Sequence, residues 1–140
     1  YQNAWGEYAI PILLYAPGDD NMKGVTNEII QQIDIMPTVL GYLNYNKPFL
    51  AYANNVLDST QQDPHFAYQY SGGYRWFQGD YLLMSDALKP GKLYNWKIDR
   101  FLQPDLAQQI PDTLARMNKR LKAFIQQYNN RLIDNRLTVR

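Results

Sequence analysis

The residues of this chain that could do chemistry are few and widely spaced. The single histidine, His65, follows Asp63 and Pro64, and no motif places a Ser or an acidic partner beside it. We therefore interpret it as a loop histidine rather than as a general base or a metal ligand. Asp19-Asp20-Asn21 offers oxygen ligands, but it lacks the alternating ligands and the terminal Glu of an EF-hand loop. We interpret this stretch as a solvated turn.

A catalytic metal centre needs about three protein ligands that converge on an open position. The chain has one histidine and no cysteine, so such a centre is hard to assemble from its residues. We therefore assign no nucleophile, no metal ligand and no cofactor to this chain by itself.

The bulk composition is that of an ordinary globular domain. The 140 residues are 46% hydrophobic and 19% charged, with a net charge of +1. A balanced charge argues against a nucleic-acid partner. The longest apolar run, Ala9 to Ala16, is much shorter than the ~20 residues of a transmembrane helix. We expect a soluble chain.

The elements that must position any site begin with this apolar run. Ala9 to Ala16 is closed by Pro17-Gly18, which predicts a strand buried on both faces of a parallel sheet. A surface loop over 18–24 follows. Further on, the spacing of apolar residues predicts an amphipathic helix that starts after Asp34, contains Thr38 and stops before Asn46-Lys47-Pro48. We expect the Asp34 carboxylate to cap this helix, and Thr38, inside it, is not read as a nucleophile.

The second part of the chain has a different pattern of apolar residues. Four short aromatic-rich runs, separated by turn residues, predict an antiparallel meander over 66–70, 74–77, 81–85 and 93–98. A helical period returns over 112–132, and this helix should cover one face of the meander. Its apolar stripe consists of Leu114, Met117, Leu121, Phe124, Ile125, Tyr128 and Leu132.

The aromatic residues of the meander and the basic residues of the helix each allow a functional interpretation as well as a structural one. The aromatic side chains of the meander could stack on sugar rings or lipid, but strand spacing favours cross-strand packing. They are Tyr70, Tyr74, Trp76, Phe77 and Tyr81. The basic side chains of the helix could contact phosphate or a membrane surface, but a solvated helix face is the better interpretation. They are Arg116, Lys119, Arg120, Lys122 and Arg131.

Two segments, in this order, resemble the end of a sulfatase or of a lipoteichoic-acid-synthase-type phosphotransferase, both of the alkaline phosphatase superfamily. The first combines Ile10-Pro11-Ile12-Leu13-Leu14-Tyr15-Ala16-Pro17-Gly18 with Asp34-Ile35-Met36-Pro37-Thr38-Val39-Leu40. The second combines Gly79-Asp80-Tyr81-Leu82-Leu83, Lys92-Leu93-Tyr94-Asn95-Trp96-Lys97-Ile98-Asp99 and Asp105-Leu106-Ala107. Arg100 and Asp105 depart from the family pattern, which commonly has Pro and Asn at these places.

The resemblance implies an α/β to α+β fold. Residues 1–57 would be the C-terminal end of a parallel α/β sulfatase-like core, and residues 58–140 a subdomain in which a small antiparallel sheet packs against a long C-terminal helix. The intact enzyme would be a metal-dependent hydrolase or transferase of sulfate or phosphate esters. Phosphoglycerol- or phosphoethanolamine-type transfer is slightly favoured.

The resemblance also implies where the missing parts lie. The nucleophile and the ligands of a divalent cation (Mn, Mg, Zn or Ca) would precede Tyr1, so the partner of this chain would be the rest of the catalytic domain. Such an enzyme would be extracytoplasmic, periplasmic or at the cell surface, and anchored in the bacterial inner membrane through a region outside this chain.

Asn3, Trp5 and Glu7 would then follow the metal-binding loop directly and form a substrate rim. We further expect the isolated chain to self-associate, because one parallel strand without its sheet leaves unpaired edges. The alternative is a non-catalytic module that binds a glycan or a protein through the Tyr/Trp-rich sheet.

Overall fold

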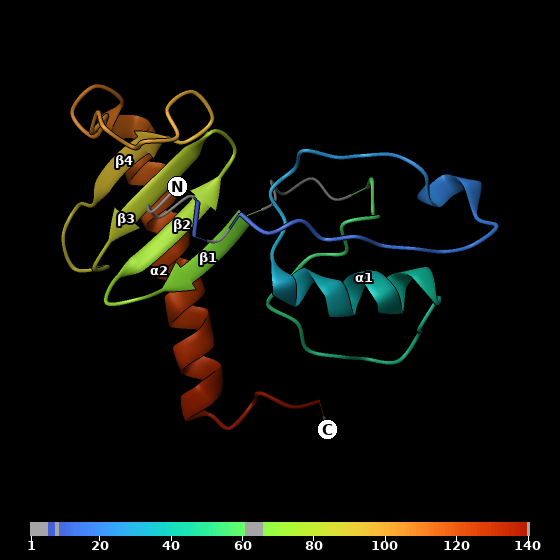
Figure 1. Cartoon of the computed structure of the whole chain (residues 1–140). Helices are drawn as coiled ribbons and strands as arrows, with labels where there is room; N and C mark the ends of the chain where they lie inside the picture. The colour runs from blue at the N-terminus through green and yellow to red at the C-terminus, as the bar shows by residue number, and fades with distance from the viewer. Residues whose placement is uncertain (1–5, 8, 61–65, 140) are drawn as a thin grey trace.

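The computed structural model describes residues 6–7, 9–60 and 66–139, and Figure 1 shows two parts side by side. We call residues 6–60 the N-terminal half and residues 66–139 the C-terminal half. The N-terminal half contains two 3-10 turns, η1 (Asp20–Met22) and η2 (Gln32–Asp34), and the helix α1 (Ile35–Tyr42). The C-terminal half contains β1 (Phe66–Tyr70), β2 (Tyr74–Gln78), β3 (Tyr81–Ser85), β4 (Lys92–Asn95) and α2 (Pro111–Ile133).

The four strands form an antiparallel meander in the order β1-β2-β3-β4. Gly72 and Gly79 make the first two turns with positive φ angles of 65° and 56°, which glycine adopts without steric cost. The pairing places Trp76 opposite both Tyr68 and Leu83, and Leu83 opposite Leu93. The predicted meander and long C-terminal helix are confirmed.

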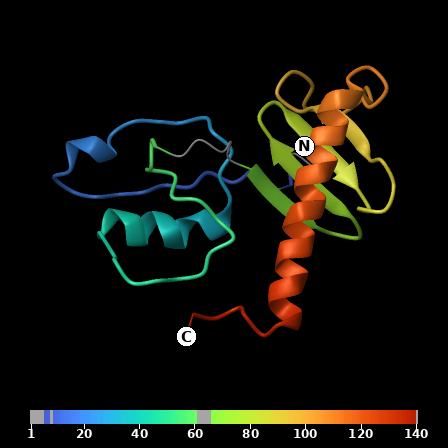
Figure 2. The ribbon, with the colours of Figure 1, turned by 180° about the vertical axis from the view of Figure 1, so that it is seen from behind.

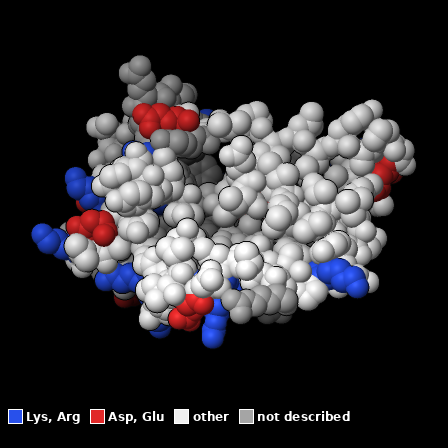
Figure 3. Space-filling model, turned by 90° about the horizontal axis from the view of Figure 1, so that it is seen from below, with Lys and Arg blue, Asp and Glu red and all other residues white. Residues whose placement is uncertain are grey.

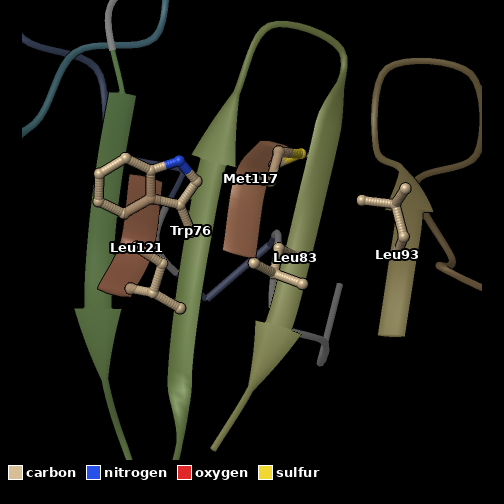
Figure 4. Close-up of a cluster of buried hydrophobic side chains, with 5 residues drawn as sticks. All are labelled: Trp76, Leu83, Leu93, Met117 and Leu121. Atoms are coloured by element: carbon tan, nitrogen blue, oxygen red, sulfur yellow. The ribbon is translucent and has the colours of Figure 1, made fainter. Parts of the chain in front are cut away.

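The core of the C-terminal half lies between the sheet and α2, which crosses one face of the sheet (Figure 2). Side chains alternate between the faces of a strand, so Trp76, Leu83 and Leu93 point to the same face. There they meet Met117 and Leu121 of α2, and all five side chains are buried (Figure 4). Phe66 stacks on Trp76 with the ring centroids 4.2 Å apart.

Only the first part of the apolar stripe of α2 is covered by the sheet. Towards the end of the helix, Tyr128 and Leu132 are 39% and 53% exposed, because α2 continues past the sheet (Figure 1). Tyr52 of the N-terminal half also packs against this helix, with its ring 5.8 Å from Phe124 and 5.4 Å from Tyr128 between centroids.

The strand predicted over Ala9 to Ala16 is not formed within this chain. The segment is extended but belongs to no sheet, and Leu13 and Tyr15 are 89% and 83% exposed. Ile12 and Leu14 are half-buried and line a small cavity with residues that include Ile30. A parallel strand needs neighbouring strands to pair its amides and carbonyls, and residues 9–60 contain no strand that could do so.

The last strand of the meander is shorter than the predicted 93–98. It ends at Asn95, whose side-chain oxygen accepts hydrogen bonds from the amides of Lys97 (3.2 Å) and Ile98 (3.1 Å). These local bonds turn the chain away from the sheet, and Ile98 is 84% exposed.

Candidate functional site

The predicted substrate rim is only partly visible. Asn3 and Trp5 lie outside the described residues. Glu7 is described, and its carboxylate lies 3.9 Å from the guanidinium of Arg75 on β2. Arg75 is the neighbour of Trp76 in the strand, so it points away from α2. Glu7 therefore lies near the face of the sheet that α2 leaves open.

A groove of about 420 Å³ lies at one end of the sheet, between the β1–β2 turn and the β3–β4 loop. The strands provide its floor and the two connections provide its walls. It is lined by Ser71, Gly72, Gly73, Tyr74, Arg75, Met84, Ser85, Asp86, Lys89, Pro90, Gly91 and Lys92.

The floor of the groove is a row of side chains across three strands. Arg75 lies opposite Met84, and Met84 lies opposite Lys92. All three occupy the sheet face that α2 does not cover, because their neighbours Trp76, Leu83 and Leu93 face α2. Strands lie about 4.8 Å apart, so the two cationic residues start from backbones about 10 Å apart.

The loop between β3 and β4 is held in shape by several local hydrogen bonds. The Asp86 carboxylate accepts from the amides of Leu88 (2.8 Å) and Lys89 (2.9 Å), and Ser85 Oγ accepts from the amide of Ala87 (3.0 Å). The amide of Lys89, then that of Leu88, lowers the pKa of Asp86. A Cβ at Gly91 would collide with the carbonyl oxygen of Met84, so glycine is required there.

The other carboxylate-bearing candidates have structural roles. Asp19 accepts from the amide of Asn21 (3.0 Å) and from the hydroxyl of Tyr42 (2.9 Å), in that order the main causes of its lowered pKa. The same contact raises the pKa of the Tyr42 phenol. Asp20 pairs with Lys23 at the surface. The interpretation of Asp19-Asp20-Asn21 as a solvated turn is confirmed, and His65 lies outside the described residues.

Asp34 does not cap α1 through its side chain, contrary to prediction. It is buried, and its two carboxylate oxygens accept from the amides of Gln31 (2.8 Å) and Asn54 (2.8 Å). The carboxylate is drawn to the amide of Asn54 because the chain returns along α1 at this point. Thr38 donates to the carbonyl of Asp34 (2.6 Å) and accepts from the amide of Val56 (3.1 Å). Both side chains therefore hold the segment after α1 in place.

The aromatic residues of the meander serve mainly in packing. Trp76 is buried, and Tyr74 and Tyr81 pack against the core cluster. Phe77 lies on the other face, with its ring 6.4 Å from that of Trp96. Tyr70 differs, since it is 64% exposed and packs against Tyr74. The prediction of cross-strand packing is confirmed for these core residues.

The basic residues of α2 do not gather into a pocket. Arg116, Lys119 and Lys122 are exposed, whereas Arg120 and Arg131 are half-buried. Their interpretation as a membrane contact stays untested. No helix among the described residues is long and apolar enough to cross a membrane.

A divalent cation does not fit the residues that the structure describes. Over 6–7, 9–60 and 66–139, no group of three or more His, Asp and Glu side chains could hold a metal ion. The groove itself is lined by one carboxylate, Asp86, one oxygen of which accepts from two backbone amides.

No protein-family model matches the chain, and no curated protein matches it significantly. The family resemblance therefore rests on the residues of this chain.

The sequence did not draw attention to the groove. Its two walls, Ser71-Gly72-Gly73 and Lys89-Pro90-Gly91, carry only the turn signals that separate the predicted strands. One signal was present: Arg75 is out of phase with the inward-facing Trp76, and Lys92 with Leu93, so both cations point away from the core.

Proposed function

We propose that this chain is the C-terminal part of a sulfatase-like enzyme of the alkaline phosphatase superfamily, which hydrolyses or transfers a sulfate or phosphate ester. One observation carries the proposal: outside the core of the C-terminal half, the chain leaves many large apolar side chains exposed. Its accessible surface is 10239 Å², whereas a compact monomer of 16.4 kDa exposes about 7500 Å². The excess is of the size of an obligate interface.

The exposed surface is concentrated where the resemblance expects a larger α/β core. In the extended segment 9–16, Leu13 and Tyr15 point to solvent, and α1 exposes Met36 and Val39 by 46% and 42%. On the face of the molecule that Figure 3 shows, charged side chains are sparse over the half that carries α1. A neighbouring parallel strand and a covering helix would bury these residues and pair the free backbone groups.

The pieces of the second segment that resembles the sulfatase family are joined by hydrogen bonds in the structure. Asp105 uses a single carboxylate oxygen to accept from the amides of Leu93 (3.1 Å) and Ala107 (3.0 Å), and the amide of Leu106 donates to the carbonyl of Leu93 (2.7 Å). The amide oxygen of an Asn could accept the same bonds. The departure from the family pattern at Asp105 therefore preserves the contact that fastens this loop to β4.

In this proposal the chain supplies scaffold and rim. The nucleophile and the ligands of the divalent cation (Mn, Mg, Zn or Ca) come from the rest of the catalytic domain. Phosphoglycerol- or phosphoethanolamine-type transfer is favoured over sulfate-ester hydrolysis, and the enzyme works outside the cytoplasm. The alternative, a glycan- or protein-binding module that uses the Tyr/Trp-rich sheet, has less support because α2 covers the face that carries Trp76.

The test is to express the longest reading frame that contains this chain and to measure bound metal and ester hydrolysis. We expect an Asp-His pair shortly before Tyr1, a stoichiometric divalent cation, and hydrolysis of an aryl sulfate or an aryl phosphodiester. The 140-residue chain alone should hydrolyse neither ester. A reading frame with no Asp-His pair and no upstream Thr, Ser or Cys nucleophile would overturn the proposal, as would ester hydrolysis by the isolated chain.

A further inference from the structure

We propose that the groove at the end of the sheet binds the anionic part of a sulfated or phosphorylated ligand. The groove is lined by three cationic side chains, Arg75, Lys89 and Lys92, and by one carboxylate, Asp86, while the carboxylate of Glu7 lies 3.9 Å from the guanidinium of Arg75. The cations therefore outnumber the carboxylates by one, and a concave site with an excess of positive charge concentrates anions.

The carboxylate of Asp86 offsets only part of the positive charge of the groove. Asp86 accepts from the amides of Leu88 and Lys89 with a single oxygen, and these contacts shape the loop; the charge of Lys89 also contributes to the lowered pKa of Asp86. Among the described residues, no carboxylate lies within 4.0 Å of the ammonium of Lys92 or of Lys89. The two ammonium groups are therefore available to a ligand.

The three cations differ in the freedom they have. Arg75 is held in place, because its guanidinium donates to Gln69 (2.9 Å) and lies near Glu7. Lys92 and Lys89 are exposed, one at the start of β4 and one in the loop before it. A held guanidinium and two adjustable ammonium groups suit sulfate or phosphate oxygens, which accept several charge-assisted hydrogen bonds at once.

The backbone around the groove supports a ligand-binding role. Ala87 adopts a positive φ of 65°, a conformation that is uncommon for a residue other than glycine and that clusters at binding sites. Gly91 brings the loop so close to Met84 that no side chain fits. The walls are therefore preorganised, so that little conformational entropy is lost when a ligand binds.

The groove also has a place in the proposed enzyme. Glu7 belongs to the predicted substrate rim and lies beside Arg75, a lining residue of the groove. This second step rests on the proposed function: the groove would hold an anionic group of the substrate away from the reacting ester. Anion binding itself depends only on the groove.

The experiment is an NMR titration of the 140-residue chain with three probes: inorganic phosphate, a sulfated disaccharide and the same disaccharide without sulfate. We expect the two anions to shift the amide signals of Gly72, Gly73 and Gly91, and the uncharged sugar to leave them in place. Added salt should weaken binding, because surface charges are screened.

Two matched double variants locate the site. Lys89→Gln with Lys92→Gln removes two charges from the groove, and we expect it to weaken binding of the sulfated disaccharide about tenfold or more, at about 1.4 kcal/mol for each factor of ten. Lys119→Gln with Lys122→Gln removes two charges from α2 and should leave the affinity unchanged. Equal affinity in both variants, or shifts centred on α2, would overturn the proposal.

The two proposals fail in different ways. Anion binding at the groove without an enzymatic reading frame would leave this site intact and remove the sulfatase-like assignment. Ester hydrolysis by the longer protein, together with no amide shifts in the groove, would support the sulfatase-like assignment and remove the groove as an anion-binding site.

Discussion

At the scale of single residues, Asp34 connects two separate segments of the N-terminal half. Its carboxylate is buried and accepts two backbone amides, one before η2 and one after α1. An amide that loses its partner in a buried place costs free energy comparable to a broken hydrogen bond. Asp34 therefore fixes the return of the chain along α1.

Replacing Asp34 should show this directly. We expect Asp34→Ala to lower the free energy of unfolding of the N-terminal half by about 3 kcal/mol, because two charge-assisted hydrogen bonds are lost. Asp34→Asn should cost less, since it keeps one acceptor oxygen. The measurement is amide hydrogen exchange of Gln31 and Asn54, combined with urea unfolding.

The matched control is Asp20→Ala. Asp20 is an exposed aspartate of η1 that pairs only with Lys23 at the surface, so its loss should cost less than about 0.5 kcal/mol. Equal stability of the Asp34→Ala and Asp20→Ala variants would contradict the role of Asp34.

The sequence predicted the importance of Asp34 but not its partner. A carboxylate before an apolar-periodic segment indicates an N-cap from local spacing alone. The observed partner, the amide of Asn54, is 20 residues away in sequence. Such a contact depends on the path of the intervening chain, which no local pattern encodes.

At the scale of elements, α2 stabilises the sheet along only part of its length. Leu121 is fully buried among Trp76, Leu83, Leu93 and Met117. Leu132 lies on the same stripe but is 53% exposed. The same residue type on the same helix therefore has two very different environments.

These two leucines provide an internal comparison. We expect Leu121→Ala to lower the free energy of unfolding by about 3 kcal/mol, through lost burial and the cavity left behind. Leu132→Ala should lower it by less than about 1 kcal/mol. Urea unfolding followed by tryptophan fluorescence measures both. A cost for Leu132→Ala as large as that for Leu121→Ala would show that the end of α2 packs more tightly than described.

The elements of the C-terminal half were predictable and those of the N-terminal half less so. Glycine turns, strand-period aromatics and the stripe of α2 are local signals, and they gave the meander and the helix within one or two residues, except for the end of β4. The run Ala9 to Ala16 carries an equally clear strand signal, but a strand also needs a partner. The groove escaped prediction because it arises from two connections that meet only in the folded sheet.

At the scale of the whole molecule, the excess of exposed apolar surface has a consequence in solution. Leu13 and Tyr15 protrude from an extended segment with unpaired backbone groups. Such an edge readily pairs with another chain. We expect the isolated chain to associate with itself in a concentration-dependent way, and sedimentation velocity would measure this.

A double variant tests whether this edge is responsible. Leu13→Lys with Tyr15→Lys should weaken the association about tenfold or more, because charges on an open edge oppose pairing. Leu88→Lys with Ile98→Lys changes two equally exposed apolar residues of the C-terminal half, each 84% exposed, and should leave the association as it is. A chain that stays monomeric at every concentration would contradict the prediction.

The strand order of the sheet has a consequence for folding kinetics. Every pairing in β1-β2-β3-β4 joins strands that are consecutive in sequence, so each hairpin closes only a short loop and loses little chain entropy. The meander and α2 can therefore form early, without waiting for distant parts of the chain. The segment 9–16 has no such local partner. In an enzyme of the proposed class, the meander with α2 would be a preformed unit, and docking of segment 9–16 would be the late step of assembly.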